Sequence, residues 1–256
     1  MSTTFRGLPA ALILVALTSG FSRHVLAQGP TVALRTTGTI MRPGDCLRLE
    51  ALALDDMPGP LSAEVTYRYA VPVVVRDKDG NESTATKPVV LRRPAGPTME
   101  GLNRLQLHLL DDTFCFGQGA VPGRYDVEVA LRSGPSGTVA ASLRTCVAFD
   151  DTNAFAAPAG PACDFLVRGL KRAESEDLLT LDADLPPGGV YRGALLRGSS
   201  VEAVLDEGVF ATGPHELTVL IPGLAQKPGG AVDLVVVERF SHASSTVVRL
   251  ALPAIR

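Results

Sequence analysis

The chain has 256 residues, with 24 Lys and Arg against 27 Asp and Glu, and its formal net charge at pH 7 is −3. Nucleic-acid binding depends on cationic contacts to phosphate, so this acidic balance argues against a nucleic-acid partner. The chain has no Trp and only 5% aromatic residues, so its cores must be built mainly from Val, Leu and Ala.

Residues 1–27 have the three parts of an export signal. Arg6 gives a positive start, residues 8–17 form an apolar stretch, and residues 25–27 are a small-residue cleavage site before Gln28. The apolar stretch is shorter than the roughly twenty residues that span a bilayer, and no later stretch is long enough. We therefore expect a cleaved signal peptide and a secreted or periplasmic protein without a membrane span.

Alternating apolar and polar residues predict β-strands throughout the first half of the remaining chain. In chain order the expected strands are residues 31–40, 46–54, 63–75 (as one strand or as two joined at Pro72), 88–92 and 102–110. A long connection over residues 111–122 follows them. A proline inside a strand pattern indicates an edge or a bend.

Residues 77–82, Asp-Lys-Asp-Gly-Asn-Glu, predict a hairpin tip, because Gly and Asn tolerate positive φ. The segment also begins like an EF-hand calcium loop. That loop ends in Glu at its twelfth position, where this chain has Pro88. We therefore interpret the segment as a plain turn.

The most regular strand follows Pro122 and Gly123. Its apolar face consists of Tyr125, Val127, Val129 and Leu131. A period of two is typical of a strand with one buried face. Residues 133–137 then form a turn into a second strand, residues 138–149. Because such a hairpin is typical of the last two strands of an immunoglobulin-like sandwich, we interpret residues 28–150 as one such domain.

The next segment, residues 151–162, is rich in Ala, Pro and Gly and lacks periodicity, which indicates a linker. Residues 163–256 form a second domain of short strands separated by Pro-Gly and Gly-Gly turns. Its expected strands are residues 165–170, 178–185, 190–196, 200–205, 216–221, 231–239 and 246–252. The predicted fold class is all-β, with two immunoglobulin-like β-sandwich domains after a cleaved signal peptide.

Part of the second domain resembles a known family. Residues 216–222, 228–237 and 244–248 look like the end of an IPT/TIG domain, and the resemblance covers residues 186–253. That family has an immunoglobulin-like fold and occurs in bacterial surface and secreted proteins and in some transcription factors. It carries no catalytic residues, so the resemblance implies none here. The first domain resembles bacterial immunoglobulin-like modules in pattern, and its Tyr125 resembles their tyrosine-corner residue.

An even set of cysteines in an exported chain indicates disulfides. The four are Cys46, Cys115, Cys146 and Cys163, and none lies at the spacing of a zinc site. Three pairings can be drawn. In an immunoglobulin-like strand order the first three lie at one end of the sandwich, and Cys163 leaves that end. This favours Cys46–Cys115 and Cys146–Cys163, each stabilising the fold by about 2–4 kcal/mol.

Paired aspartates suggest a calcium site at the same end. The expected strand order brings together Asp111, Asp112, Asp150 and Asp151. Clustered carboxylates repel one another unless a cation intervenes, and calcium takes six to eight oxygen ligands. The alternative is that aspartate ends strands because it favours turns, with each carboxylate in water.

No catalytic pattern accompanies these features. His108, His215 and His242 lack a neighbouring nucleophile-and-carboxylate pattern, and neither Gly-x-Ser-x-Gly nor His-Glu-x-x-His occurs. We therefore expect no enzyme and no cofactor other than calcium. The expected function is a non-catalytic secreted or periplasmic module that binds a protein or another envelope component. The alternatives are a structural stalk or accessory spacer, and a hydrolase whose site has no recognisable motif.

Overall fold

The computed structural model describes residues 29–117, 120–134, 137–150, 166–172, 177–206, 210, 213–221, 223 and 230–252. Every regular secondary-structure element among these residues is a β-strand, so the all-β prediction is confirmed. The expected signal peptide, residues 1–27, and the expected linker, residues 151–162, lie outside them. The described residues include no helix that is long and apolar enough to cross a membrane.

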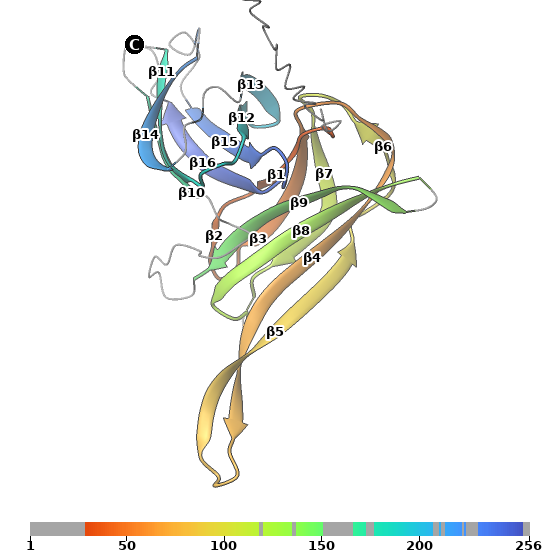
Figure 1. Ribbon diagram of the computed structural model, residues 1–256, viewed down its shortest axis with the longest axis vertical. Helices are drawn as coiled ribbons and strands as arrows, with labels where there is room; N and C mark the ends of the chain where they lie inside the picture. The colour runs from red at the N-terminus through yellow and green to blue at the C-terminus, as the bar shows by residue number, and fades with distance from the viewer. Residues whose placement is uncertain are drawn as a thin grey trace, which may run out of the picture.

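The first half forms two facing sheets (Figure 1). Sheet A has the order β1 (Val32–Thr36), β3 (Cys46–Ala53), β7 (Leu107–Cys115). Sheet B has the order β2 (Ile40–Met41), β9 (Thr138–Phe149), β8 (Gly123–Ser133), β4 (Met57–Arg76), β5 (Glu82–Pro94), with β6 (Met99–Leu102) beside the start of β4. The pairing of β2 with β9 is parallel, and the other pairings are antiparallel.

The first core lies between sheets A and B. The predicted alternation on β8 is confirmed, because its four apolar side chains from Tyr125 to Leu131 are all buried. Aromatic rings fill one end of this core, with centroids 4.6–5.8 Å apart. These rings belong to Tyr67, Phe114, Phe116, Tyr125 and Phe149. Such a cluster compensates for the absence of Trp, since aromatic pairs add to the free energy of burial.

Two elements of the first half extend beyond their predicted bounds. β4 is a single strand of 20 residues that includes Pro72, one of the two expected alternatives, and it begins at Met57 rather than at residue 63. β7 begins at Leu107 and extends to Cys115, so Asp111 and Asp112 lie inside a strand rather than in the expected connection. The aspartates are accommodated because Asp112 has buried hydrogen-bonding partners, described below.

The second half also forms two sheets. Sheet C has the order β10 (Leu166–Arg172), β11 (Leu178–Leu185), β14 (Gly213–Leu220). Sheet D has the order β13 (Ser200–Leu205), β12 (Tyr191–Arg197), β15 (Gly230–Glu238), β16 (Ser244–Leu252). All seven strands predicted for this half are present, with ends shifted by no more than a few residues. A second core includes Leu179, Leu195, Leu234 and Val236.

A third core joins the two halves, between sheets A and D. Its members are Ala33, Leu52, Leu54, Ala194, Leu196, Val235 and Val237. Along β15, Leu234 and Val236 face the second core, whereas Val235 and Val237 face sheet A. Sheets A and D are therefore apolar on both faces, and the four sheets stack in the order B, A, D, C. We call the contact between sheets A and D the junction.

Polar contacts fix the register of the junction. Alternate backbone N–H groups at the edge of β1 donate to alternate side chains at the start of β16, which lies beside it (Figure 1), and in the turn just before it. The pairs are Val32 N to His242 Nδ1 at 3.3 Å, Leu34 N to Ser244 Oγ at 2.9 Å and Thr36 N to Thr246 Oγ1 at 3.3 Å. These side chains satisfy a strand edge that has no backbone partner there, so the edge is closed without a continuous sheet.

Two ion pairs flank the same contact. Arg35 of β1 pairs with Asp233 of β15, and its Nη1 donates to the carbonyl of Gly198 at 2.6 Å. Arg192 of β12 donates to Asp55 at 2.8 Å. The side chains of Arg35 and Asp233 are only 14% and 13% exposed, so removal of either would leave a largely buried charge.

Candidate functional site

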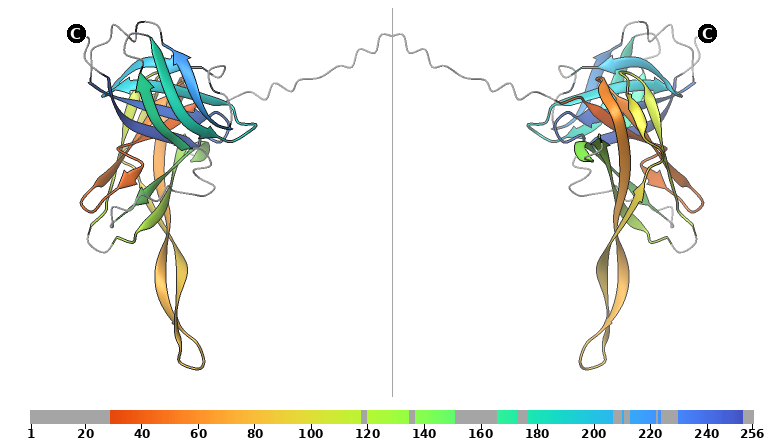
Figure 2. Two further views of the ribbon diagram at one scale, coloured as in Figure 1. Left: turned by 90° about the vertical axis from the view of Figure 1, so that its left-hand side faces the viewer. Right: turned by 90° about the vertical axis from the view of Figure 1, so that its right-hand side faces the viewer.

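A two-stranded ribbon extends from sheet B (Figure 1). β4 pairs with β8 only as far as Arg68, which faces Asp126. Its pairing with β5 continues to Arg76 opposite Glu82. Beyond Arg68, the two strands therefore pair only with each other among the described residues, and we call residues 69–89 the ribbon. The two side views show it projecting away from the stacked sheets (Figure 2).

Local chemistry explains why the ribbon turns back on itself. The Asp77 carboxylate accepts hydrogen bonds from the backbone N–H groups of Asp79 at 2.9 Å and Asn81 at 2.8 Å. Gly80 has φ of +85°, which residues other than Gly adopt with strain. Arg76 pairs with Glu82 across the first rung of the hairpin. This agrees with the turn predicted for residues 77–82 and with its interpretation as a plain turn.

The ribbon carries apolar side chains on both faces. One face continues the core face of sheet B, and we call it the inner face; it contains Tyr69, Val71, Val73 and Val75, opposite Val89, Lys87, Ala85 and Ser83. The other face is the outer face, where Val74 is 68% exposed and Val90, just beyond the ribbon, is 54% exposed. Val75 at the end of the inner face is 44% exposed. On the outer face the exposed residues Ala70 and Pro72 adjoin Val74, and such a stretch of exposed apolar residues is a candidate interaction surface.

Prolines occupy both edges of the ribbon. Pro72 is paired with Thr86, and Pro88 with Ala70, two rungs apart on opposite strands. Proline has no N–H to donate, so a paired proline must direct its nitrogen away from its partner strand, toward the open edge. Each edge therefore lacks a donor that an added strand would need, and contact through the faces is favoured over strand addition.

The base of the ribbon is anchored to the first core. The ring of Tyr69 stacks on that of Tyr125 with centroids 4.7 Å apart. Tyr125 in turn donates its hydroxyl to the carbonyl of Val121 at 2.9 Å, and burial raises the pKa of this hydroxyl. A groove of about 610 Å³ lies here, between the ribbon and the start of β8, with Pro72, Pro88 and Tyr125 among its lining residues.

A buried tyrosine and a buried aspartate lie next to this contact, in the first core. The Tyr67 hydroxyl donates to Asp112 at 2.6 Å, and Arg93 lies 3.5 Å from the other carboxylate oxygen. Burial, followed by the negative charge and hydrogen bond of Asp112, raises the pKa of Tyr67 well above its usual value. The Arg93 guanidinium also lies 5.5 Å from the ring centroid of Phe114, as a cation–π contact. Asp112 is therefore a structural hydrogen-bond acceptor.

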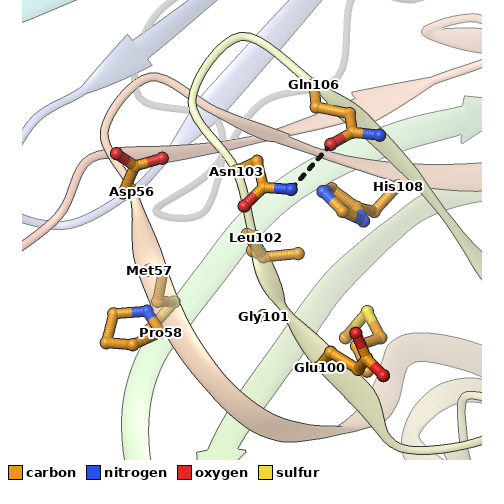
Figure 3. Close-up of a pocket in the computed structure, with 10 residues that line it drawn as sticks. Asp56, Met57, Pro58, Glu100, Gly101, Leu102, Asn103, Gln106 and His108 are labelled. Carbon is orange, nitrogen blue, oxygen red and sulfur yellow. Dashed lines mark hydrogen bonds between the residues drawn. The ribbon is translucent and has the colours of Figure 1, made fainter.

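A second hollow, of about 650 Å³, lies where β6 meets the start of β4 and β7 (Figure 3). Its polar lining residues include Asp56, Glu100, Asn103, Gln106 and His108. Asn103 donates to Gln106 at 3.2 Å, and no hydrogen bond to His108 Nε2 is present in the described part of the chain. Burial lowers the pKa of His108, which favours a neutral imidazole.

The turn beside this pocket is strained. Leu105 has φ of +58° at the third position of the turn 103–106, a conformation that favours Gly or Asn. Backbone strain often accompanies functional sites. The pocket offers hydrogen-bonding side chains, and its described lining residues include no nucleophile aligned to a base.

Among the predicted disulfides, Cys46–Cys115 is present. The two residues face each other on β3 and β7, at the solvent-exposed end of the face of sheet A that is turned away from sheet B, and so the bridge does not join the two sheets of the sandwich. Cys146 is also disulfide-bonded. Cys163 lies outside the described residues, so Cys146–Cys163 stays a prediction.

The four aspartates predicted to bind calcium are placed as follows. Strand alternation turns Asp111 toward solvent and Asp112 into the core, where Tyr67 and Arg93 engage it. Asp150 follows β9, and its backbone N–H donates to Met41 at 3.0 Å. Asp151 lies outside the described residues. Within the described ranges no group of three or more His, Cys, Asp or Glu side chains could hold a metal ion. Calcium binding stays a prediction.

No model of a known protein family matches the chain, so the IPT/TIG resemblance is not supported by a family match. No curated protein sequence matches it either. Similar solved structures include Spo0M, a sporulation control protein of Bacillus subtilis, with 11% identity, a TM-score of 0.30, and coverage of 81% of this chain and 78% of that one.

Bacterial α2-macroglobulins are also similar. The Escherichia coli protein activated by porcine elastase has 14% identity and a TM-score of 0.31, with 86% of this chain and 22% of that chain covered. The Salmonella protein reacted with methylamine has 14% identity and a TM-score of 0.27, with coverage of 88% and 14%. This chain thus spans less than a quarter of the length of either macroglobulin. At these TM-scores the likenesses carry no argument about function.

Proposed function

We propose that this chain is an exported, non-catalytic binding module of the cell envelope, and that the ribbon is its contact surface for a protein partner. The observation that carries the proposal is the exposure of a valine-rich ribbon whose edges are closed by Pro72 and Pro88. Two-stranded ribbons are marginally stable in water by themselves. An exposed apolar ribbon is therefore a feature that a binding partner would explain.

We further propose that both halves are immunoglobulin-like sandwiches. The order of strands in sheets A and B corresponds to that of a variable-type immunoglobulin domain, in which β4 and β5 take the places of strands C and C′. The bond from Tyr125 near the start of β8 to Val121 supports this, since a tyrosine corner has the same position and the same backward hydrogen bond. The ribbon is then an elongated C–C′ hairpin.

A spacer function is the second candidate, and a different observation favours it. The third core and the β1–β16 side-chain contacts join the halves over a broad apolar area. Such a junction holds two sandwiches at a fixed angle, which suits a rigid arm. No specific observation favours the hydrolase alternative.

Photo-cross-linking in the native host cell tests the binding function. A photoreactive residue replaces Val74 on the outer face of the ribbon, and in a matched control it replaces Val139 of β9, which is 49% exposed. We expect a discrete adduct with another protein at position 74 and none at position 139. Equal labelling at both positions, or none at position 74, would favour the spacer function instead.

A ribbon deletion provides the second arm of the test. Residues 70–88 are replaced by a two-residue Asn-Gly turn, which suits a short hairpin. Thermal unfolding should still be cooperative, because the first core ends at the base of the ribbon. If the shortened protein folds and still forms the same adduct through other positions, the ribbon is not the contact surface.

A further inference from the structure

The tip of the ribbon contains an acceptor sequence for N-linked glycosylation. Asn81 is followed by Glu82 and Ser83, which gives the pattern Asn-x-Ser with a residue other than Pro in the middle. The other asparagines of the chain, Asn103 and Asn153, have Leu and Phe two residues later, so neither completes the pattern. The pattern is short enough to occur by chance, and its place in the fold therefore decides whether a transferase could use it.

The acceptor sequence lies at the most accessible end of the ribbon. The turn between β4 and β5 is at its far end, away from the stacked sheets (Figure 2). Every residue from Val74 to Pro88 is exposed, and β4 and β5 pair only with each other here among the described residues. An enzyme can therefore reach Asn81 without contacting either half of the molecule. A glycosylated asparagine requires such a surface position.

The reacting groups of the acceptor sequence are weakly held. The Nδ2 of Asn81 donates to Asp77 Oδ2 at 2.9 Å, in full contact with water, which can replace this bond at little cost. The hydroxyl of Ser83 has only a long contact, 3.4 Å, to the carbonyl of Val75. The first core ends at the base of the ribbon, so the tip can open locally while that core stays intact. Asn81 and Ser83 can therefore enter an enzyme's active site in the folded protein.

We propose that Asn81 is an N-glycosylation site, modified after export by an oligosaccharyltransferase whose sugar donor is a lipid diphosphate-linked oligosaccharide. The side-chain nitrogen of Asn81 forms a bond to the anomeric carbon of the first sugar, and the bond from that carbon to the diphosphate oxygen breaks. The amide loses one proton, and the lipid diphosphate leaves with the electron pair of the broken bond. A glycan is bulky and solubilising, so at this place it keeps in water a ribbon whose Val74 and Val75 are exposed.

The inference rests on the proposed export of the chain, and mass spectrometry of the protein purified from its native host tests both. The intact chain is expected to begin near Gln28 and to carry the mass of one oligosaccharide. Trypsin cuts after Lys78 and next after Arg92, because Lys87 precedes Pro88, so the tryptic peptide 79–92 contains the acceptor sequence. Fragmentation of this peptide should place the sugar on Asn81. An exported chain in which Asn81 is unmodified overturns the proposal.

Four variants separate this site from other attachments. Asn81→Gln and Ser83→Ala should each lower the modified fraction at least about tenfold, because the first removes the acceptor and the second breaks the pattern. Ser83→Thr keeps the pattern and should change the fraction less than about twofold. Asn103→Gln is the matched control, since Asn103 is also exposed in a turn with a hydrogen-bonded amide, and it should leave the glycan in place. A sugar lost in Ser83→Ala but kept in Asn81→Gln overturns the proposal, because it is then attached to Ser83.

The two hypotheses fail separately. An exported, unmodified chain whose position 74 still cross-links to another protein removes the glycosylation and leaves the binding function. A glycosylated chain with no cross-linked partner at position 74 supports the modification and removes the proposed contact. A chain that keeps residues 1–27 and stays inside the cell overturns both, because the sugar transfer and the partner contact are each proposed to follow export.

Discussion

The junction and the ribbon contain the same kind of sequence but differ in what covers it. β15 at the junction has the run Leu234–Val237, and β4 in the ribbon has Val73, Val74 and Val75 in succession. At the junction both faces of the run are buried, one by each neighbouring core. In the ribbon Val74 and Val75 are exposed, and Val73 is only partly buried by the described part of the chain. A run without polar alternation therefore indicates that both faces need a neighbour, and it does not show whether that neighbour belongs to the same chain.

The largest expected difference between the two regions is in stability. Val235→Ala at the junction, where the side chain is 1% exposed, should lower the free energy of unfolding by about 2–3 kcal/mol. Val74→Ala removes the same atoms from a side chain that is 68% exposed and should change it by less than about 0.5 kcal/mol. Urea unfolding at neutral pH measures both. Equal effects would mean that the ribbon is covered in solution.

A smaller difference is expected for single hydroxyl groups. Ser244→Ala removes the acceptor of the buried Leu34 N–H and should destabilise the protein by about 1–2 kcal/mol. Ser83→Ala in the ribbon removes an exposed 3.4 Å contact to Val75, which water replaces, with an expected change below about 0.5 kcal/mol. A neutral Ser244→Ala variant would show that the β1 edge is closed by water rather than by β16.

The smallest expected effect is an acid dependence at the junction. Burial acts to raise the pKa of Asp55, but the Thr31 N–H and the Arg192 guanidinium outweigh it, so the net pKa lies below its ordinary value. A carboxyl whose folded pKa is lowered contributes stability above its unfolded pKa of about 3.9, and this is lost as pH falls through the folded pKa. Because its side chain is 42% exposed, the contribution should be under about 1 kcal/mol.

Urea unfolding at neutral pH and below about pH 4 measures this contribution. Asp55→Asn should lose less stability on acidification than the wild type. Glu100→Gln is the control, because Glu100 is exposed and makes no ion pair among the described residues. Identical acid dependence in the wild type and Asp55→Asn would show that the Arg192–Asp55 contact does not stabilise the junction.

Period-two alternation was sufficient to place most strands and the first core. The β8–β9 hairpin, its buried face from Tyr125 to Leu131 and the seven strands of the second half followed from short-range pattern and turn residues. The Cys46–Cys115 pair followed from strand order, because Cys46 begins β3 and Cys115 ends β7 at the same end of sheet A. These features depend on local sequence or on simple topology, and both can be inferred from the alternation of apolar and polar residues.

Other features depend on partners far away in the chain. Asp112 can lie inside β7 because Tyr67, 45 residues earlier, donates to it, and no local pattern encodes that bond. Pro72 can lie inside β4 because the pairing of β4 with β8 ends at Arg68, which leaves an open edge where the missing N–H of Pro72 is tolerated. The junction could have been inferred from the sequence, because residues Leu234–Val237 and Ala51–Leu54 are apolar without interruption, as expected of strands buried on both faces.

The edge of β1 has a consequence for how the chain reaches its native state. Its three donors find their acceptors on residues 210 positions later in the sequence. Contacts of such long range form slowly, because a large loop must close before they contribute any stability. During synthesis the first sandwich can assemble its own core while one strand edge and one apolar sheet face stay bare, and a bare edge can recruit other chains. The extent of aggregation should therefore increase with the time between completion of β9 and the pairing of β16 with the edge of β1.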